Sequence, residues 1–135
     1  MLNSPITRFS ADVVSLFACD PDQIRADAAM RRRAGLPVYI PGPFSRIDTR
    51  GKISLEWEAP ASASEQPKVT IQASLNPGAV IPRYAVAFIA VTAGGESMLI
   101  GDPFHFPEVS TKRSLSGAGA EVCIVHSQIP LLVFV

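Results

Sequence analysis

Tyr84-Ala-Val-Ala-Phe-Ile-Ala-Val91 is an apolar run without a single charged residue. A polar break that contains glycine follows it, Thr92-Ala-Gly-Gly-Glu96, and then a second apolar run, Ser97-Met-Leu-Ile100. A continuous apolar run bounded by turn residues is typical of a strand buried on both faces, and a short break with glycine is typical of a hairpin. We therefore predict a β-sheet at the centre of the fold, with a hairpin whose first strand is covered on both sides.

Two further stretches, residues 52–58 and 68–75, alternate between apolar and polar residues. The apolar positions are Ile53, Leu55 and Trp57 in the first stretch, and Val69, Ile71, Ala73 and Leu75 in the second. A period of two with polar residues between predicts antiparallel strands that bury one face and expose the other.

Four further runs complete the set of predicted strands. They cover residues 9–18, 104–110, 121–126 and 130–135. The 12 prolines stand at the edges of apolar runs or between them, because proline removes a backbone donor and is kept out of central strands. We predict a mainly β fold, a compact antiparallel sandwich or barrel of about seven to eight short strands with one N-terminal surface helix.

The helix is expected over residues 20–35. Asp20 is suited to cap it, Pro21 suits its first turn, and Gly35 is a typical stop. Its apolar stripe is thin, so we expect either a short surface helix of about three turns or a segment that becomes ordered only against a neighbour. The chain is expected to be a single domain, in which residues 1–43 form an N-terminal strand, helix and proline-rich arm, and residues 44–135 form the β core.

The composition favours association with other proteins over binding to nucleic acid. Of the 135 residues, 47% are hydrophobic and only 18% are charged, and the formal net charge is zero. A neutral chain has no overall charge repulsion to oppose association near neutral pH, and it lacks the basic excess that phosphate binding needs. No apolar run approaches the roughly 18 residues of a membrane-spanning helix.

The N-terminal region is expected to remain uncleaved. Residues 14–19, Val-Ser-Leu-Phe-Ala-Cys, loosely resemble a lipoprotein cleavage box, but Asp12 interrupts the apolar core that such a signal needs. We expect a chain made in the bacterial cytoplasm without a signal peptide.

The two cysteines, Cys19 and Cys123, are too few for a disulfide framework. Cys123 lies in the predicted strand 121–126, and free thiols inside strands behave mostly as small apolar residues. We interpret Cys123 as a residue of the core.

One set of residues has the composition of a metal site. It consists of His105, Glu108 and His126, with Asp102 nearby. His105 and Glu108 are three residues apart around a proline, which is not a ligand spacing known on a strand. We therefore interpret His105 as a turn residue and His126 as a strand-end residue, and we expect no metal.

Catalytic motifs are lacking elsewhere in the sequence. There is no Gly-x-Ser-x-Gly turn, and neither cysteine has an obvious base beside it. The carboxylate pair Glu56 and Glu58 is explained first by the solvated face of a strand. We expect a protein without catalytic residues or a cofactor.

Three places are expected to make contacts with other proteins. A basic cluster lies at the end of the predicted helix, where it either meets an acidic partner or complements the helix dipole. The apolar C-terminus either completes its own sheet or adds to the edge of a neighbour. Together with an aromatic residue of the proline-rich arm, the candidate residues are Arg31, Arg32, Arg33, Tyr39, Leu131, Leu132, Val133, Phe134 and Val135.

From Pro41 to Val135 the chain resembles small, uncharacterised β-rich proteins of bacterial prophages and mobile elements. The resemblance rests on a proline-rich entry, an alternating strand pair, and a hairpin that ends in Leu99-Ile-Gly-Asp-Pro103. A stretch with serine and glycine and a terminal apolar strand follow, from Ser114 to Val135. The resemblance implies a virion or tail component, or a part of an injection machine, and no catalytic residues.

We expect a non-catalytic structural subunit that packs against copies of itself or against other virion proteins, and whose final location is a virion or similar assembly. The alternative is a monomeric binding module, for example for carbohydrate, that uses Trp57, Tyr39 or Tyr84 as a stacking platform. A metal-dependent enzyme that uses His105 and His126 is the third hypothesis.

Overall fold

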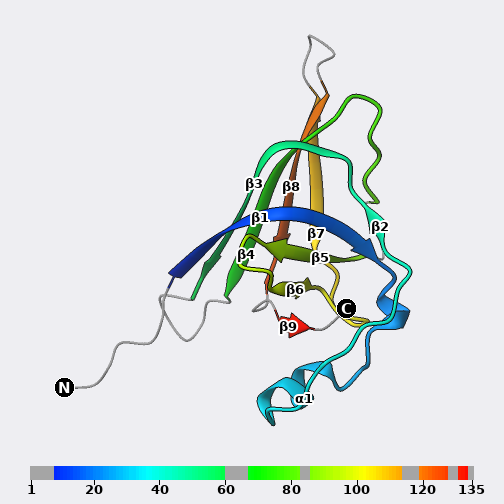
Figure 1. The fold of residues 1–135 in the computed structure, drawn as a ribbon, viewed down its shortest axis with the longest axis vertical. Coiled ribbons are helices and arrows are strands. Elements are labelled where there is room, and N and C mark those ends of the chain that lie inside the picture. The colour runs from blue at the N-terminus through cyan, green and yellow to red at the C-terminus, as the bar shows by residue number, and fades with distance from the viewer. Residues whose placement is uncertain (1–7, 60–66, 83–85, 114–118, 128–130, 134–135) are drawn as a thin grey trace, which may run out of the picture.

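A computed structural model describes residues 8–59, 67–82, 86–113, 119–127 and 131–133. The elements are β1 (Arg8–Cys19), the 3₁₀ turn η1 (Pro21–Gln23), α1 (Ala28–Arg33), β2 (Ser45–Arg46), β3 (Thr49–Glu58), β4 (Lys68–Leu75), β5 (Ala87–Thr92), β6 (Ser97–Ile100), β7 (Glu108–Arg113), β8 (Ala120–His126) and β9 (Leu131–Val133). All strand pairs are antiparallel, in the order β7-β8-β4-β3-β1-β5-β6-β9, with β2 beside β1. The predicted mainly β fold is confirmed, as a curled half-barrel sheet (Figure 1).

The sheet has to curl because short segments join strands at its two sides. β8 is second from one edge and β9 forms the other edge. In a flat sheet the six strand intervals between them would span about 29 Å. The chain from His126 to Leu131 reaches at most about 18 Å. Only a curled sheet brings the end of β8 close enough to β9.

β1 is the strand that joins the two halves of the sheet. Its first half pairs with β3, from Arg8 to Val13, and its second half pairs with β5, from Val13 to Cys19. The pairing with β5 shifts register between Val13 and Ser15, and Val14 at this irregularity is exposed. Such bulges increase the local twist of a strand. One long strand therefore joins the β3-β4-β8-β7 half of the sheet to the β5-β6-β9 half.

The predicted burial of the hairpin on both faces is confirmed for residues 86–90. Phe88 and Ala90 belong to the main core inside the curl, whereas Ala87 and Ile89 belong to a second cluster on the opposite face of β5. Each of these four residues is at most 1% exposed. The sheet is thus packed on both faces at β5, and an outer layer has to cover its second face.

The outer layer consists of η1, α1 and the extended segment that follows them. Ile24, Ala28, Val38 and Ile40 pack in the second cluster together with Leu99 of β6 and Val133 of β9. Figure 1 shows α1 beside β9. The outer layer therefore covers the β5-β6-β9 half and leaves the outer face of the other half to solvent.

The helix predicted over residues 20–35 is shorter than expected. Asp20 caps a 3₁₀ turn by accepting a hydrogen bond from the Asp22 N–H at 3.0 Å, and Pro21 stands at the start of that turn, as predicted. The backbone becomes extended at Ile24, whose side chain is buried in the second cluster. α1 then has only six residues. Burial of Ile24 is the reason for the break, because it turns this side chain toward β5.

Gly35 ends α1 as predicted. Its φ is 75°, the Leu36 N–H donates to the Arg31 carbonyl at 2.8 Å, and the Gly35 N–H donates to the Arg32 carbonyl at 3.1 Å. This pair of hydrogen bonds is the Schellman arrangement, which satisfies the last carbonyl groups of a helix. The outer layer therefore has a fixed end from which the extended segment starts.

The predicted boundaries of several strands lie close to the observed ones. β4 and β6 have the predicted bounds, whereas β3 begins three residues before its predicted start and β8 begins one residue before it. The strand predicted over residues 104–110 is wrong at its start, because residues 101–107 form a loop and β7 begins at Glu108. The short strand β2 was not predicted.

Gly101 offers a test of the close packing where this loop leaves β6. Its φ is 106°, and a Cβ atom added to it would lie 3.0 Å from Cδ of Pro107 and 3.2 Å from Cβ of Ala87. We expect Gly101→Ala to lower the free energy of unfolding by about 2–4 kcal/mol, from backbone strain and overpacking together. The measurement is urea unfolding followed by circular dichroism.

Gly51→Ala is the matched control. Gly51 also has a positive φ, 70°, but open space surrounds it. Gly51→Ala should therefore lower the free energy of unfolding by about 1–2 kcal/mol, from backbone strain alone. Equal losses for the two variants would contradict close packing at Gly101.

Candidate interaction surface

The basic cluster at the end of α1, Arg31 to Arg33, contributes to the contacts within the outer layer. Arg31 and Arg32 are half-buried, and Arg33 is exposed. The Nε of Arg31 donates a hydrogen bond to the Pro37 carbonyl at 3.3 Å, which ties the helix to the segment after it. Of the three arginines, Arg33 is the one whose side chain is most available to a partner.

Earlier in the outer layer, a further arginine, Arg25, is held by a neighbouring carboxylate. Arg25 makes a two-point contact with Asp27, at 2.9 and 3.1 Å. The hydrogen bond from Arg25 lowers the pKa of the Asp27 carboxyl. Both side chains are on the surface, and such pairs contribute little to stability. Arg25 is therefore occupied within its own chain.

Tyr39 projects from the outer layer into solvent. Its neighbours Val38 and Ile40 are each 1% exposed, whereas Tyr39 is 61% exposed. An extended segment points successive side chains in opposite directions, so burial of Val38 and Ile40 turns Tyr39 outward. Met30 and Leu36 of the same layer are also exposed. The outer layer thus presents apolar side chains on its solvent side.

Residues 101–107 form a second projecting element, which carries two exposed phenylalanines. Phe104 is 68% exposed and Phe106 is 46% exposed. The loop joins β6 on one side of the sheet to β7 at the opposite edge, so it crosses the open side of the half-barrel. Neither phenylalanine was among the residues predicted to contact partners. The signal was present in the sequence as Phe104-His-Phe106, but the predicted strand assigned these side chains to a sheet.

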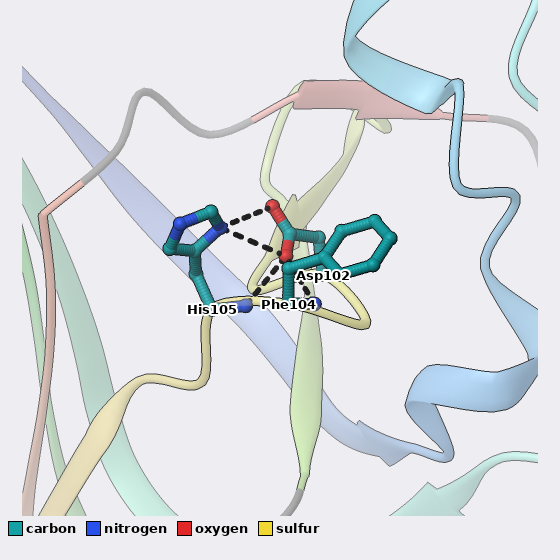
Figure 2. A network of polar contacts seen from close by, with 3 residues as sticks. All are labelled: Asp102, Phe104 and His105. Carbon is teal, nitrogen blue, oxygen red and sulfur yellow. Dashed lines mark hydrogen bonds and ion pairs between the residues drawn. The ribbon is translucent and has the colours of Figure 1, made fainter.

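The Asp102 carboxylate shapes this loop (Figure 2). Its Oδ1 accepts hydrogen bonds from the backbone N–H groups of Phe104 and His105, at 2.7 and 2.6 Å. Nδ1 of His105 lies 3.2 Å from Oδ1 and 3.3 Å from Oδ2. The Asp102 N–H donates to the His105 carbonyl at 3.0 Å. Figure 2 shows the rings of Phe104 and His105 on opposite sides of the carboxylate, so the turn itself presents Phe104 outward.

The two edges of the sheet differ in length and polarity. β9 pairs with β6 through Leu131, Leu132 and Val133, and Val133 is buried in the second cluster. Of the two readings of the C-terminus, the structure shows the strand in its own sheet. Phe134 and Val135 lie outside the described residues. At the other edge, β7 is six residues long and pairs with β8. Within the described ranges, neither β7 nor β9 has a strand on its other side.

The outer face of the β3-β4-β8-β7 half is polar. It contains a groove of about 570 Å³ between β4, β7 and β8. The groove is lined by Lys52, Gln72, Ala73, Ser74, Ser110, Thr111, Lys112, Glu121, Val122 and Cys123. None of these residues is aromatic, so the groove has no platform on which a sugar ring could stack.

Trp57 does not form a stacking platform on the surface. It is 8% exposed, belongs to the main core and stacks against Phe9 with ring centroids 5.4 Å apart. In the alternative hypothesis of a carbohydrate-binding module, the use of Trp57 as a surface stacking platform is therefore wrong. Tyr39 is exposed but stands on the outer layer, and Tyr84 lies outside the described residues.

The residues of the metal hypothesis do not form one group. His105 pairs with Asp102, whereas His126 is buried at the end of β8, in register with Val69 of β4. In the part of the chain that the structure describes, no three or more histidine, cysteine, aspartate or glutamate side chains could hold a metal ion together. The loop histidine and the strand-end histidine have the positions that the sequence predicted.

The prediction that Cys123 belongs to the core is wrong. Cys19 is the buried thiol, in the second cluster, and Cys123 is only partly buried. Cys123 alternates with Val122 and Ile124 of the core and therefore faces the outer side of β8. Burial, together with the nearby Asp20 charge, raises the pKa of Cys19 to about 11. Cys19 thus behaves as a core residue, and Cys123 is the thiol nearer to solvent.

No protein-family model, no curated protein and no solved structure matches this chain. None of the helices in the described ranges is long and apolar enough to cross a membrane.

Substitution of Asp102 tests its role in the loop. We expect Asp102→Ala to lower the free energy of unfolding by about 1–2 kcal/mol, because two backbone donors lose a charged acceptor. Hydrogen exchange at the Phe104 and His105 amides should accelerate. Asp102→Asn keeps one acceptor oxygen and should lose less. Unchanged exchange in Asp102→Ala would show that the carboxylate does not hold the loop.

Trp57→Ala tests the assignment of this residue to the core. The expected loss is about 3–5 kcal/mol in the free energy of unfolding, as for other large aromatic truncations. The exposed Tyr39 provides the control, and Tyr39→Ala should change stability by no more than about 0.5 kcal/mol. A folded Trp57→Ala variant of natural stability would be evidence for a surface role.

Proposed function

We propose that this protein is a non-catalytic structural subunit of the phage virion or tail type, which acts through contacts with copies of itself or with other virion or injection-machine proteins. The open edge of the sheet carries the proposal. β7 offers the outward backbone groups of a six-residue strand, and such an edge is a template for pairing with another chain. A subunit in an assembly satisfies these groups with a strand from its neighbour.

Exposed apolar side chains support the same function. Phe104 and Phe106 stand on a loop fixed by Asp102, and Tyr39 stands on the outer layer. Rigid aromatic side chains are the usual anchors of protein interfaces, because they bury a large area at a small entropic cost. The neutral net charge adds no repulsion between copies.

The geometry near the histidines supports a structural role over an enzymatic one. The Asp102–His105 pair has the form of a catalytic dyad, but the same carboxylate oxygen also accepts two backbone hydrogen bonds. The pair is therefore accounted for by the folding of the loop. It lies on an exposed turn, whereas active sites are usually concave.

The solution mass of the full chain tests the proposal. Light scattering over a wide range of concentrations should give a mass that exceeds the 14.4 kDa of one chain and increases with concentration. Phe104→Ser combined with Phe106→Ser should shift association to higher concentration if the aromatic loop forms part of an interface. If the natural chain and the double variant are both compact monomers at all concentrations, self-association is contradicted.

A further inference from the structure

The edge strand β7 has a sequence that is complementary to itself. It reads Glu108-Val-Ser-Thr-Lys-Arg113. We propose that two copies of the chain join β7 to β7, antiparallel, about a two-fold axis at Ser110, with Glu108 of each copy opposite Lys112 of the other. This proposal rests on the proposed function and deepens it, because it names the partner and the register.

The side chains that would meet lie on one face of β7. Glu108, Ser110 and Lys112 alternate along the strand and are exposed. In register with β8 they lie opposite Val125, Cys123 and Glu121. Val109 and Thr111 point to the other side and are half-buried, and Val109 packs against the main core. The edge therefore offers a polar row on the outer face of the sheet and a partly apolar row on the inner face.

The charges on this row favour one register. With Ser110 opposite Ser110 of the second copy, Glu108 meets Lys112 twice, and Val109 meets Thr111 twice. If the axis moves by one residue to Thr111, Lys112 meets Ser110 and both charge pairs are lost. The same happens if it moves to Val109. Opposite charges directly across an antiparallel pair stabilise it, and like charges destabilise it.

The neighbouring strand leaves Glu108 available for this contact. Its partner in register on β8 is Val125, which is apolar, so Glu108 has no charged side chain directly across in its own sheet. Lys112 lies opposite Glu121 in its own sheet. In the proposed pair it would stand between two carboxylates, Glu121 of its own chain and Glu108 of the second copy. A lysine on an edge usually discourages pairing, but here the second copy supplies its counter-charge.

One end of the β7 edge lies far from the outer layer. Figure 1 shows the Arg113 end of β7 and the Ala120 end of β8 at the opposite end of the molecule from β9 and the outer layer. An antiparallel pair of identical strands has a two-fold axis, so the contact closes on itself and stops at two copies. The outward N–H and C=O groups of β7 then pair with those of the second β7. The result is one continuous sheet across the dimer.

Charge-swap variants test the register directly. In a dimer of Glu108→Lys, both contacts between positions 108 and 112 join two lysines. In a dimer of Lys112→Glu, both contacts join two glutamates. Each variant alone should form dimers with a dissociation constant about tenfold higher or more. An equimolar mixture should form mixed dimers, because each lysine then meets a glutamate, and the double variant Glu108→Lys/Lys112→Glu should dimerise like the natural chain. The measurement is sedimentation equilibrium, with circular dichroism to verify the fold.

A cysteine at the axis provides a second measurement. In a Cys123→Ser background, which removes the thiol beside position 110, Ser110→Cys should form an intermolecular disulfide under mild oxidation. Residues directly opposite on antiparallel strands have Cβ atoms about 4.5–5.5 Å apart, close to what a disulfide needs. Lys112→Cys in the same background is the control and should not crosslink, because position 112 faces position 108.

The outcomes separate this inference from the proposed function. Suppose that the natural chain associates, that the charge variants associate as strongly as it does, and that Ser110→Cys crosslinks no more than Lys112→Cys. The β7 contact is then wrong, and assembly through another surface stands. If the natural chain is a monomer at every concentration and Ser110→Cys does not crosslink, the β7 contact and self-association are both overturned.

Discussion

Burial of β5 on both faces is the constraint on which the rest of the structure depends. Phe88 and Ala90 require a core inside the curl, and Ala87 and Ile89 require a cover outside it. The first demand is met by the facing half of the sheet, including Ile71 of β4 and Ile124 of β8. The second is met by the outer layer, which contributes Ile24 and Val38. A single sheet thus becomes a three-layer structure at one strand, while its other half keeps a polar face in solvent.

The curl also determines which strands lie at the edges of the sheet and which loop crosses between its two sides. Because the sheet does not close, β7 and β9 remain at its edges, and the loop that joins β6 to β7 has to cross between the two sides. That loop turns tightly around the Asp102 carboxylate, which leaves Phe104 in solvent. The edge and the aromatic loop are therefore consequences of the same open architecture. The proposed assembly function relies on this edge and this loop.

Much of the fold could be predicted from the sequence, because alternation reports directly on which face of a strand is buried. The apolar rows of β3 and β4 were predicted on that basis. The hairpin from β5 to β6 was predicted instead from two continuous apolar runs around a break that contains glycine. The order of the strands could not be, since alternation does not say which strand is the neighbour of which. The wrong placement of Cys123 has a related cause: a shift of one residue in phase moves a side chain to the other face.

The contact residues were harder to predict than the strands. A run such as Phe104-His-Phe106 has the composition of a strand, and only the hydrogen bonds of Asp102 with the backbone show that it is a turn. Tyr39 was predicted as a contact residue of the proline-rich arm, and the structure shows that its side chain is exposed. The break of the helix at Ile24 depended on burial against β5, a tertiary contact that local propensity does not contain.

The position of β1 between β3 and β5 has a consequence for folding kinetics. Cys19 pairs with Ala87 and Val13 with Thr92, so these partners are about 70–80 residues apart along the chain. Pairings between such distant segments pay a large loop-closure entropy before any contact compensates for it, and proteins rich in them fold in milliseconds to seconds. During synthesis, β1 is complete long before β5 leaves the ribosome. For that interval its second half lacks the main partner that later makes it the centre of the sheet.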